Sequence, residues 1–245
     1  MRAAGRLVGE VLSALAPKVV PGISTGELDA LAERLIVDAG ATPAFKGYHG
    51  YPATICASVN EQVIHGIPSR QRVLEEGDIL SIDVGAELEG YYGDSAITLP
   101  VGRVSDEAAT LLRVTEESLY KAIETVKPGA RVSDIGHAVQ QHVEAHGFSV
   151  VREFVGHGIG QRMHEEPQIP NYGEPGRGPR LSEGMVLAIE PMVNAGKPAV
   201  KVLSDGWTAV TKDKSLSAHF EHTVAVMADG AWILTSREVP AIAGR

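Results

Sequence analysis

The chain has 245 residues, enough for one large domain or two small ones with a substantial core. Hydrophobic residues make up 44% and charged residues 22%, the balance of an ordinary globular protein. The formal net charge is −9 with no block of basic residues, so direct binding of DNA or RNA is not expected.

Two amphipathic helices are predicted at the start of the chain. Apolar residues recur at helical spacing up to Leu15, and Pro17 interrupts that first helix. Ser24 followed by Glu27 is the signature of a capping box, which predicts that a second helix begins there. Gly40 is suited to end this second helix because glycine adopts the left-handed conformation without strain.

Two more helices are predicted in the middle of the chain, and five other segments are predicted to be strands. Ser105, followed by two acidic residues, opens a third helix, and a fourth ends at Gly147. The segments rich in β-forming residues are Ile79–Val84, Tyr91–Leu99, Met185–Glu190, His219–Met227 and Trp232–Leu234. Helices grouped before strands predict an α+β fold with an antiparallel sheet.

An internal repeat relates the two halves of the chain. Pro21–Gly40 aligns with Pro128–Gly147 at an offset of 107 residues. Leu74–Asp83 aligns with Leu181–Glu190 at the same offset. A shared offset in two separate segments is difficult to produce by chance, so we expect two similar halves.

Acidic residues stand at corresponding places in this repeat. A turn centred between Leu88 and Glu89 would place Asp83 directly opposite Asp94, with Cβ atoms about 5 Å apart. Opposed carboxylates destabilise a sheet unless one is protonated or a cation lies between them. The alternative is that one aspartate points outward into solvent.

The second half supplies further candidates for a cation site. Glu190 is the counterpart of Asp83, and the apolar stretches before both acids suggest burial, which is costly without a cation. His157 lies between two glycines that would let the backbone turn sharply around a ligand. Residue patterns alone also allow a structural role for His157 and an exposed position for Glu221 at the start of an edge strand.

Six short motifs are spread over essentially the whole chain. They are NEQVIHGIP at 60–68, SIDVG at 81–85, Gly93-Asp94, GHGIG at 156–160, IEPM at 189–192 and EHT at 221–223. In sequence and in order they resemble type I methionine aminopeptidase in its short bacterial form, which has no N-terminal extension.

The resemblance implies the pita-bread fold, in which two pseudo-symmetric halves form a curved antiparallel sheet covered by helices. The chain 1–245 would be a single catalytic domain with halves at 1–104 and 105–245. The implied activity is removal of the initiator methionine from nascent proteins by two-metal-assisted hydrolysis of the first peptide bond, favoured by a small second residue. The implied cofactors are two divalent ions (Co, Mn, Fe, Zn or Ni), and the implied ligands are Asp83, Asp94, His157, Glu190 and Glu221.

The resemblance also assigns catalytic and substrate-binding residues. Glu190 would accept the proton of the attacking water, His164 would stabilise the developing charge, and His65 would assist substrate binding. The implied substrate-binding residues are Phe45, Tyr48, Tyr51, Cys56, His65, Met163, His164 and Trp207. Two of them depart from the usual pattern, since Phe45 replaces a common cysteine and Met163 a common aromatic residue. On sequence alone, most of these would be ordinary core residues.

Compartment and partners follow from simple exclusions. Cys56 is the single cysteine, no apolar run reaches the roughly 18 residues of a membrane span, and residues 1–6 are too polar for a secretion signal. We therefore expect a cytoplasmic protein without membrane or nucleic-acid partners, a monomer that acts on nascent polypeptides and could contact the ribosome. The alternatives are a proline-directed relative such as prolidase, a non-catalytic peptide-binding protein, and a structural calcium site.

Overall fold

The computed structural model describes residues 1–237, which form an α+β fold as predicted. The helices are α1 (Arg2–Leu15), α2 (Thr25–Asp38), α3 (Asp106–Glu124) and α4 (Val132–Ala145), with short 3₁₀ turns at Ala16–Lys18 and Tyr48–Gly50. The strands of the first half are β1 (Thr42–Pro43), β2 (Ile55–Val59), β3 (Gln62–Ile64), β4 (Ile79–Leu88) and β5 (Tyr91–Pro100). Those of the second half are β6 (Ser149–Val150), β7 (Gly156–Gly158), β8 (Glu165–Ile169), β9 (Val186–Ile189), β10 (Met192–Asn194), β11 (Val200–Val202), β12 (Ala209–Thr211), β13 (Ser217–His219), β14 (His222–Met227) and β15 (Gly230–Ile233).

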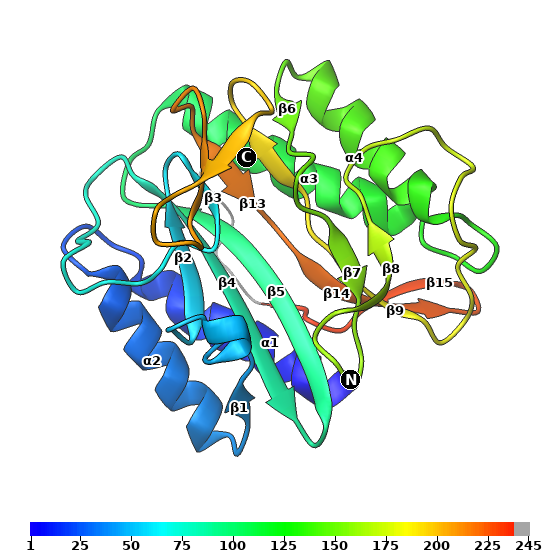
Figure 1. Cartoon of the computed structure of the whole chain (residues 1–245), viewed down its shortest axis with the longest axis horizontal. Helices are drawn as coiled ribbons and strands as arrows, with labels where there is room; N and C mark the ends of the chain where they lie inside the picture. Colours follow the sequence, from blue (N-terminus) through cyan, green and yellow to red (C-terminus); the bar gives the residue numbers. More distant parts are fainter. Residues whose placement is uncertain (238–245) are drawn as a thin grey trace.

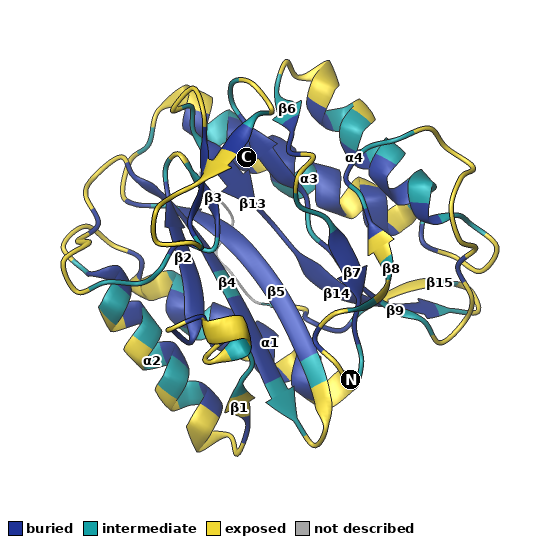
Figure 2. Cartoon of the chain, viewed as in Figure 1, coloured by how far each residue is buried: buried dark blue, intermediate teal, exposed yellow. Residues whose placement is uncertain are grey.

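Every strand pairing in the described chain is antiparallel, and the strands form the centre of the molecule. One sheet has the order β1-β4-β2 with β5 on β4, and another has the order β15-β14-β9-β7-β8. Helices α1 and α2 lie on the side of the first sheet, and α3 and α4 on the side of the second (Figure 1). The strands are largely buried, whereas the outer faces of the helices are exposed (Figure 2). This arrangement is the predicted sheet covered by helices.

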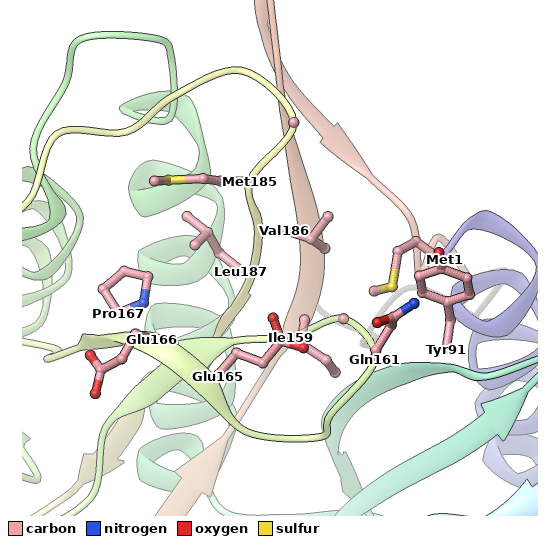
Figure 3. A pocket seen from close by; sticks show the side chains of 12 residues that line it. Met1, Tyr91, Ile159, Gln161, Glu165, Glu166, Pro167, Met185, Val186 and Leu187 are labelled. Atoms are coloured by element: carbon pink, nitrogen blue, oxygen red, sulfur yellow. The ribbon is translucent and has the colours of Figure 1, made fainter.

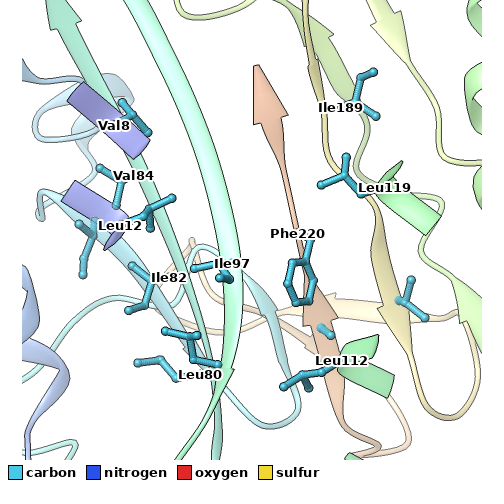
Figure 4. Close-up of a cluster of buried hydrophobic side chains, with 14 of the residues drawn as sticks. Val8, Leu12, Leu80, Ile82, Val84, Ile97, Leu112, Leu119, Ile189 and Phe220 are labelled. Atoms are coloured by element: carbon cyan, nitrogen blue, oxygen red, sulfur yellow. The ribbon is translucent and has the colours of Figure 1, made fainter. Parts of the chain in front are cut away.

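One continuous hydrophobic core joins the helices to the strands. Val8 and Leu12 of α1 pack with Ile82 of β4, and on the other side Leu119 of α3 packs with the fully buried Phe220 (Figure 4). The apolar residues of α1 recur every three or four positions, so they share one face of the helix and are buried together. This burial holds each helix pair against its own half of the sheet.

The helix ends are built as the sequence predicts. The backbone N–H of Ser24 donates to Glu27, and the side-chain oxygen of Ser24 accepts from the backbone N–H of Glu27, which completes the capping box of α2. Ser105 caps α3 by accepting from the backbone N–H of Ala108. Gly40 and Gly147 follow α2 and α4 with φ of 75° and 80°, the left-handed conformation expected of glycines that end helices.

The repeat extends to individual backbone hydrogen bonds. Helices α2 and α4 begin and end 107 residues apart, and so do the bridges Ser24↔Val73 and Arg131↔Arg180. The bond from Leu74 N–H to the Ile23 carbonyl has its counterpart 107 residues later, where Leu181 donates to Ala130. These segments of the two halves therefore have the same local backbone structure.

The predicted centre of the β4–β5 turn is wrong by one residue, which shifts the register of the two strands by two residues. Leu88 pairs with Tyr91, so the turn is made by Glu89 and Gly90, which have φ of 54° and 80°. A two-residue hairpin loop with positive φ at both positions matches the right-handed twist of the strands, which explains the shift. Asp83 therefore pairs with Ala96 instead of Asp94.

Two predicted strands are also interrupted in the structure. The segment predicted as Met185–Glu190 ends as a strand at Ile189, and the chain resumes as β10 after Pro191. The segment predicted as His219–Met227 is split into β13 and β14. The two interruptions lie opposite each other, because β9 pairs with β14 and β10 pairs with β13.

Candidate metal centre

The two aspartates lie on one face of the β4–β5 hairpin. Asp94 pairs with Gly85, and Asp83 lies two residues before Gly85 on β4. Side chains two positions apart on a strand point to the same side, so the two carboxylates are diagonal neighbours despite the corrected register. Gly85 is needed between them, because a Cβ there would be 2.6 Å from the Phe45 ring.

The two glutamates face each other at the strand interruption. Met192 pairs with His219 and Ile189 with His222, so one register continues across the break and places Glu190 opposite Glu221. Pro191 has no N–H to give to a ladder, which is one reason the strand stops there. The directly opposed acids of this site are thus the glutamates, which the sequence did not indicate.

Hydrogen bonds between β5 and the β13–β14 segment join the aspartates to the glutamates. The N–H of Glu221 donates to the carbonyl of Ala96 at 2.9 Å, and the hydroxyl of Ser95 donates to the carbonyl of Glu221 at 2.6 Å. The hydroxyl of Thr223 donates to the carbonyl of Asp94 at 2.7 Å and accepts from its N–H at 3.1 Å. These buried bonds hold the acids of both halves together at the middle of the molecule.

His157 points its imidazole into this group from β7. Its Nδ1 lies 2.9 Å from the carbonyl of Gly158, which directs Nε2 to the acids, 3.7 Å from Oε1 of Glu190 and 4.0 Å from Oδ2 of Asp94. The expectation of a sharp turn here is wrong, because the flanking glycines lie in a strand. A Cβ at Gly156 would be 2.3 Å from the Ala188 carbonyl oxygen, so glycine at this position lets the backbones of β7 and β9 approach closely.

Burial shifts the proton equilibria of all four acids. It raises the pKa of Asp83 to about 6 and that of Glu190 to about 7, and it raises the pKa values of Asp94 and Glu221 well above the usual range. Burial is the largest cause in each case, and neighbouring carboxylates add to it for Asp83, Asp94 and Glu221.

The donor set fits a divalent cation. Within residues 1–237, one carboxylate oxygen each of Asp83, Asp94 and Glu221 is buried without a hydrogen-bond partner. Ligand atoms of Asp94, His157 and Glu221 lie within 4.8 Å of one another. Buried carboxylates in this state are stabilised by a bound cation, and their oxygens with one imidazole nitrogen suit several transition metals.

A cavity of about 80 Å³ opens beside the acids. This volume exceeds the roughly 10–15 Å³ that one water needs, so a small side chain fits. Its apolar and aromatic lining residues are Phe45, Tyr51, Cys56, Met163 and Trp207, and Cys56 pairs with Asp83 across β2 and β4. The four acids, His157, His65 and His164 complete the lining. All predicted substrate-binding residues except Tyr48 therefore line this one cavity.

Tyr48 and the histidines of the site contact one another. Tyr48 is not among the lining residues of the described chain, and its hydroxyl lies 2.8 Å from Nδ1 of His164. The rings of His164 and His157 are 4.3 Å apart. Burial lowers the pKa of His65 to about 4 and lowers that of His164, so both histidines are neutral near pH 7.

Two residues near the site were not predicted from the sequence. His219 is buried with Nε2 3.6 Å from Oε2 of Glu190. Arg237 donates to Ser95 Oγ at 2.7 Å and to the Glu221 carbonyl at 3.2 Å, behind the acids. The two-residue spacing of His219 and Glu221 in a predicted strand could have indicated His219, whereas no sequence pattern indicates Arg237.

A second, larger cavity of about 340 Å³ lies away from the acids. It is lined by the loop around Gln161 and Glu165, by Tyr91 and by Met185 (Figure 3). None of the predicted site residues lines it. Across residues 1–237, no helix combines the length and apolar character that crossing a membrane requires.

Comparison with known proteins places the whole chain in one family. The profile of metallopeptidase family M24 matches residues 1–228. Methionine aminopeptidase 1 of Bacillus subtilis is 60% identical over 235 residues, which cover 96% of this chain and 94% of the relative. Methionine aminopeptidase of Escherichia coli K12 is 50% identical over 246 residues, with coverage of 99% and 93%.

Solved structures agree with this result. The crystal structure of methionine aminopeptidase from Thermotoga maritima superposes with a TM-score of 0.95 at 49% identity, covering 97% of this chain and 95% of the other. Prolidase from Pyrococcus horikoshii superposes with a TM-score of 0.79 at 25% identity, but the match covers only 62% of its chain. These proteins share the predicted pita-bread fold, and the full-length match is to the shorter enzymes.

Proposed function

Because this chain belongs to metallopeptidase family M24, we propose that it is a methionine aminopeptidase that removes the initiator methionine from nascent proteins. The observation that carries this proposal is that candidate metal-binding residues and apolar residues line the same cavity. Four acids and His157 line one small cavity together with Phe45, Tyr51, Cys56, Met163 and Trp207. Such a cavity can hold an apolar side chain next to hydrolytic groups.

The proposed metal ligands are Asp83, Asp94, His157, Glu190 and Glu221. These five residues would hold the divalent ions that the family uses, with Asp83 and Asp94 supplied by the β4–β5 hairpin and His157, Glu190 and Glu221 by the second half. When bound, such ions activate water and polarise the carbonyl of the scissile bond. The oxygen-rich set is compatible with Mn, Fe, Co, Ni or Zn, and the partly unpaired buried oxygens support it.

Three residues of the chain carry the proposed chemistry. Glu190, which lies 3.7 Å from His157 at the proposed metal site, accepts a proton from the attacking water and passes it to the leaving amine. His164 stabilises the negative charge that develops on the carbonyl oxygen, and Tyr48 orients its ring through the contact at Nδ1. His65 contacts the substrate backbone.

The proposed methionine pocket is the apolar lining of the cavity. Phe45, Tyr51, Cys56, Met163 and Trp207 surround the side chain, and the thioether of Met163 and the aromatic rings suit contact with sulfur. The preference for a small second residue is part of this proposal. Nascent chains are the proposed partners, in the cytoplasm and with the enzyme as a monomer; contact with the ribosome, nucleic acid or a membrane is not required.

The direct test is metal-dependent release of methionine. Protein stripped with a chelator and reloaded with Mn²⁺ or Co²⁺ should release methionine from Met-Gly-Met, and the Glu190→Gln variant should lose at least about 100-fold in kcat. Met-Leu-Met tests the second-residue preference, and a Gly-Pro dipeptide tests the proline-directed alternative. Methionine release that persists after exhaustive chelation would contradict the metal mechanism.

A further inference from the structure

The carboxylate of Glu190 has an imidazole on each side. Nε2 of His157 lies 3.7 Å from Oε1, and Nε2 of His219 lies 3.6 Å from Oε2. His157 is one of the proposed metal ligands, and His219 is not. Among residues 1–237, His219 is also outside the set that lines the cavity. Its role is therefore not explained by metal binding or by contact with substrate.

Two hydrogen bonds to the hydroxyl of Thr98 hold the backbone of His219 against β5. Its N–H donates to Thr98 Oγ1 at 2.8 Å, and its carbonyl accepts from the same hydroxyl at 2.8 Å. The residue is 2% exposed, and Nε2 has no hydrogen-bond partner in the described chain. A buried polar atom without a hydrogen-bond partner costs free energy. We therefore ask why Nε2 of His219 is directed at Oε2 of Glu190.

We propose that His219 is a positioning residue for Glu190, whose Oε2 accepts a hydrogen bond from Nε2–H of His219 so that Oε1 stays directed at the metal centre. This inference rests on the proposed metal centre. The present 3.6 Å is longer than a hydrogen bond, and an approach of about 0.7 Å would bring the atoms to the usual 2.9 Å.

Two substitutions separate hydrogen bonding from packing. His219→Met keeps a large buried side chain without a donor, and His219→Gln keeps an N–H donor of similar reach. Mn²⁺ titrated calorimetrically into chelator-stripped protein should bind the Met variant about 10- to 100-fold more weakly than wild type, as is usual when the partner of a ligand is lost. The Gln variant should stay within about threefold of wild type, because it restores the donor.

A matched control uses a histidine far from the centre. His142 on α4 is paired with Glu117 at 3.0 Å, and His142→Met should leave Mn²⁺ affinity unchanged. Wild-type affinity in His219→Met would overturn the proposal, and so would equal losses in the Met and Gln variants, since the ring would then act by shape alone.

A measurement on the unaltered protein decides the case if a variant fails to fold. In ¹⁵N-histidine-labelled protein loaded with Zn²⁺, the nitrogen resonances of His219 should report a proton on Nε2. A bare Nε2 would exclude the hydrogen bond and overturn the proposal. These readouts use no substrate, so a protein that binds Mn²⁺ as described but releases no methionine would contradict the proposed activity alone.

Discussion

At the scale of single residues, Glu190 has an environment that disfavours its negative charge in the metal-free protein. Burial raises its pKa to about 7, and the charge of His157 opposes this rise. A bound divalent cation would oppose this rise too, because an adjacent positive charge favours the ionised carboxylate. His164 and His65 are kept neutral by burial, so they can donate hydrogen bonds without adding positive charge.

The first prediction concerns His164. His164→Ala should lower kcat on Met-Gly-Met by about 100-fold or more, because it removes a donor to the charge that develops in the transition state. Elemental analysis should find the metal content unchanged. Tyr48→Phe is the milder comparison, since it removes only the hydroxyl that contacts Nδ1, and it should cost less. An unchanged kcat in His164→Ala would remove this residue from the mechanism.

At the scale of elements, the β4–β5 hairpin controls the geometry of the aspartates. Its turn places Glu89 in the left-handed region with φ of 54°, followed by Gly90 at 80°. Glutamate is poorly suited to that conformation, whereas asparagine and glycine adopt it readily. The turn that sets the register of Asp83 and Asp94 therefore begins with Glu89, a residue poorly suited to the left-handed conformation required there.

Substitutions at this turn should have opposite effects. Glu89→Asn should raise the free energy of unfolding by about 0.5–1 kcal/mol, because Asn-Gly is the preferred pair at such turns. Gly90→Ala should lower it by about 1 kcal/mol, since nothing contacts a new Cβ there and only the positive φ opposes it. Urea unfolding measures both changes. A loss of stability in Glu89→Asn would contradict this account of the turn.

At the scale of the whole molecule, two repeated halves meet where their acids converge. Asp83 and Asp94 come from the first half, and Glu190 and Glu221 from the second. The hydrogen bonds from β5 to the β13–β14 segment fix this meeting, so the acids cannot move apart to lower their repulsion. Protonation or bound cations are the remaining ways to stabilise the folded state.

The pH dependence of stability follows from these shifts. In chelator, Glu190 and Asp83 hold protons in the folded state up to about pH 7 and 6, whereas the unfolded chain releases them near pH 4. The folded state thus binds more protons between those limits, so the stability of the metal-free protein falls as pH rises from about 4 to 7.

Thermal unfolding in EDTA tests this prediction against a neutral mimic. Glu190→Gln cannot ionise, so its stability relative to wild type should increase between pH 5 and pH 8 by up to about 3 kcal/mol, the equivalent of the shift at this residue. Mn²⁺ should raise the melting temperature of wild type most at the higher pH. A difference between the two proteins that does not change with pH would contradict the raised pKa of Glu190.

The sequence by itself determined the helices, the repeat and the identity of the converging acids. Capping at Ser24, the left-handed glycines Gly40 and Gly147, and helical periodicity depend on nearby residues, so they can be read locally. The motifs that resemble methionine aminopeptidase carried the family and the choice of candidate residues, and the full-length relatives confirm the family.

Only the tertiary structure decided which atoms face one another. The β4–β5 register depended on two residues with positive φ, and the opposition of Glu190 and Glu221 depended on strands interrupted at one level. His219 entered the site because Thr98, on a strand of the other half, fixes its backbone. Such contacts join residues far apart in the chain, and a sequence pattern with a period of two or 3.6 residues carries no information about them.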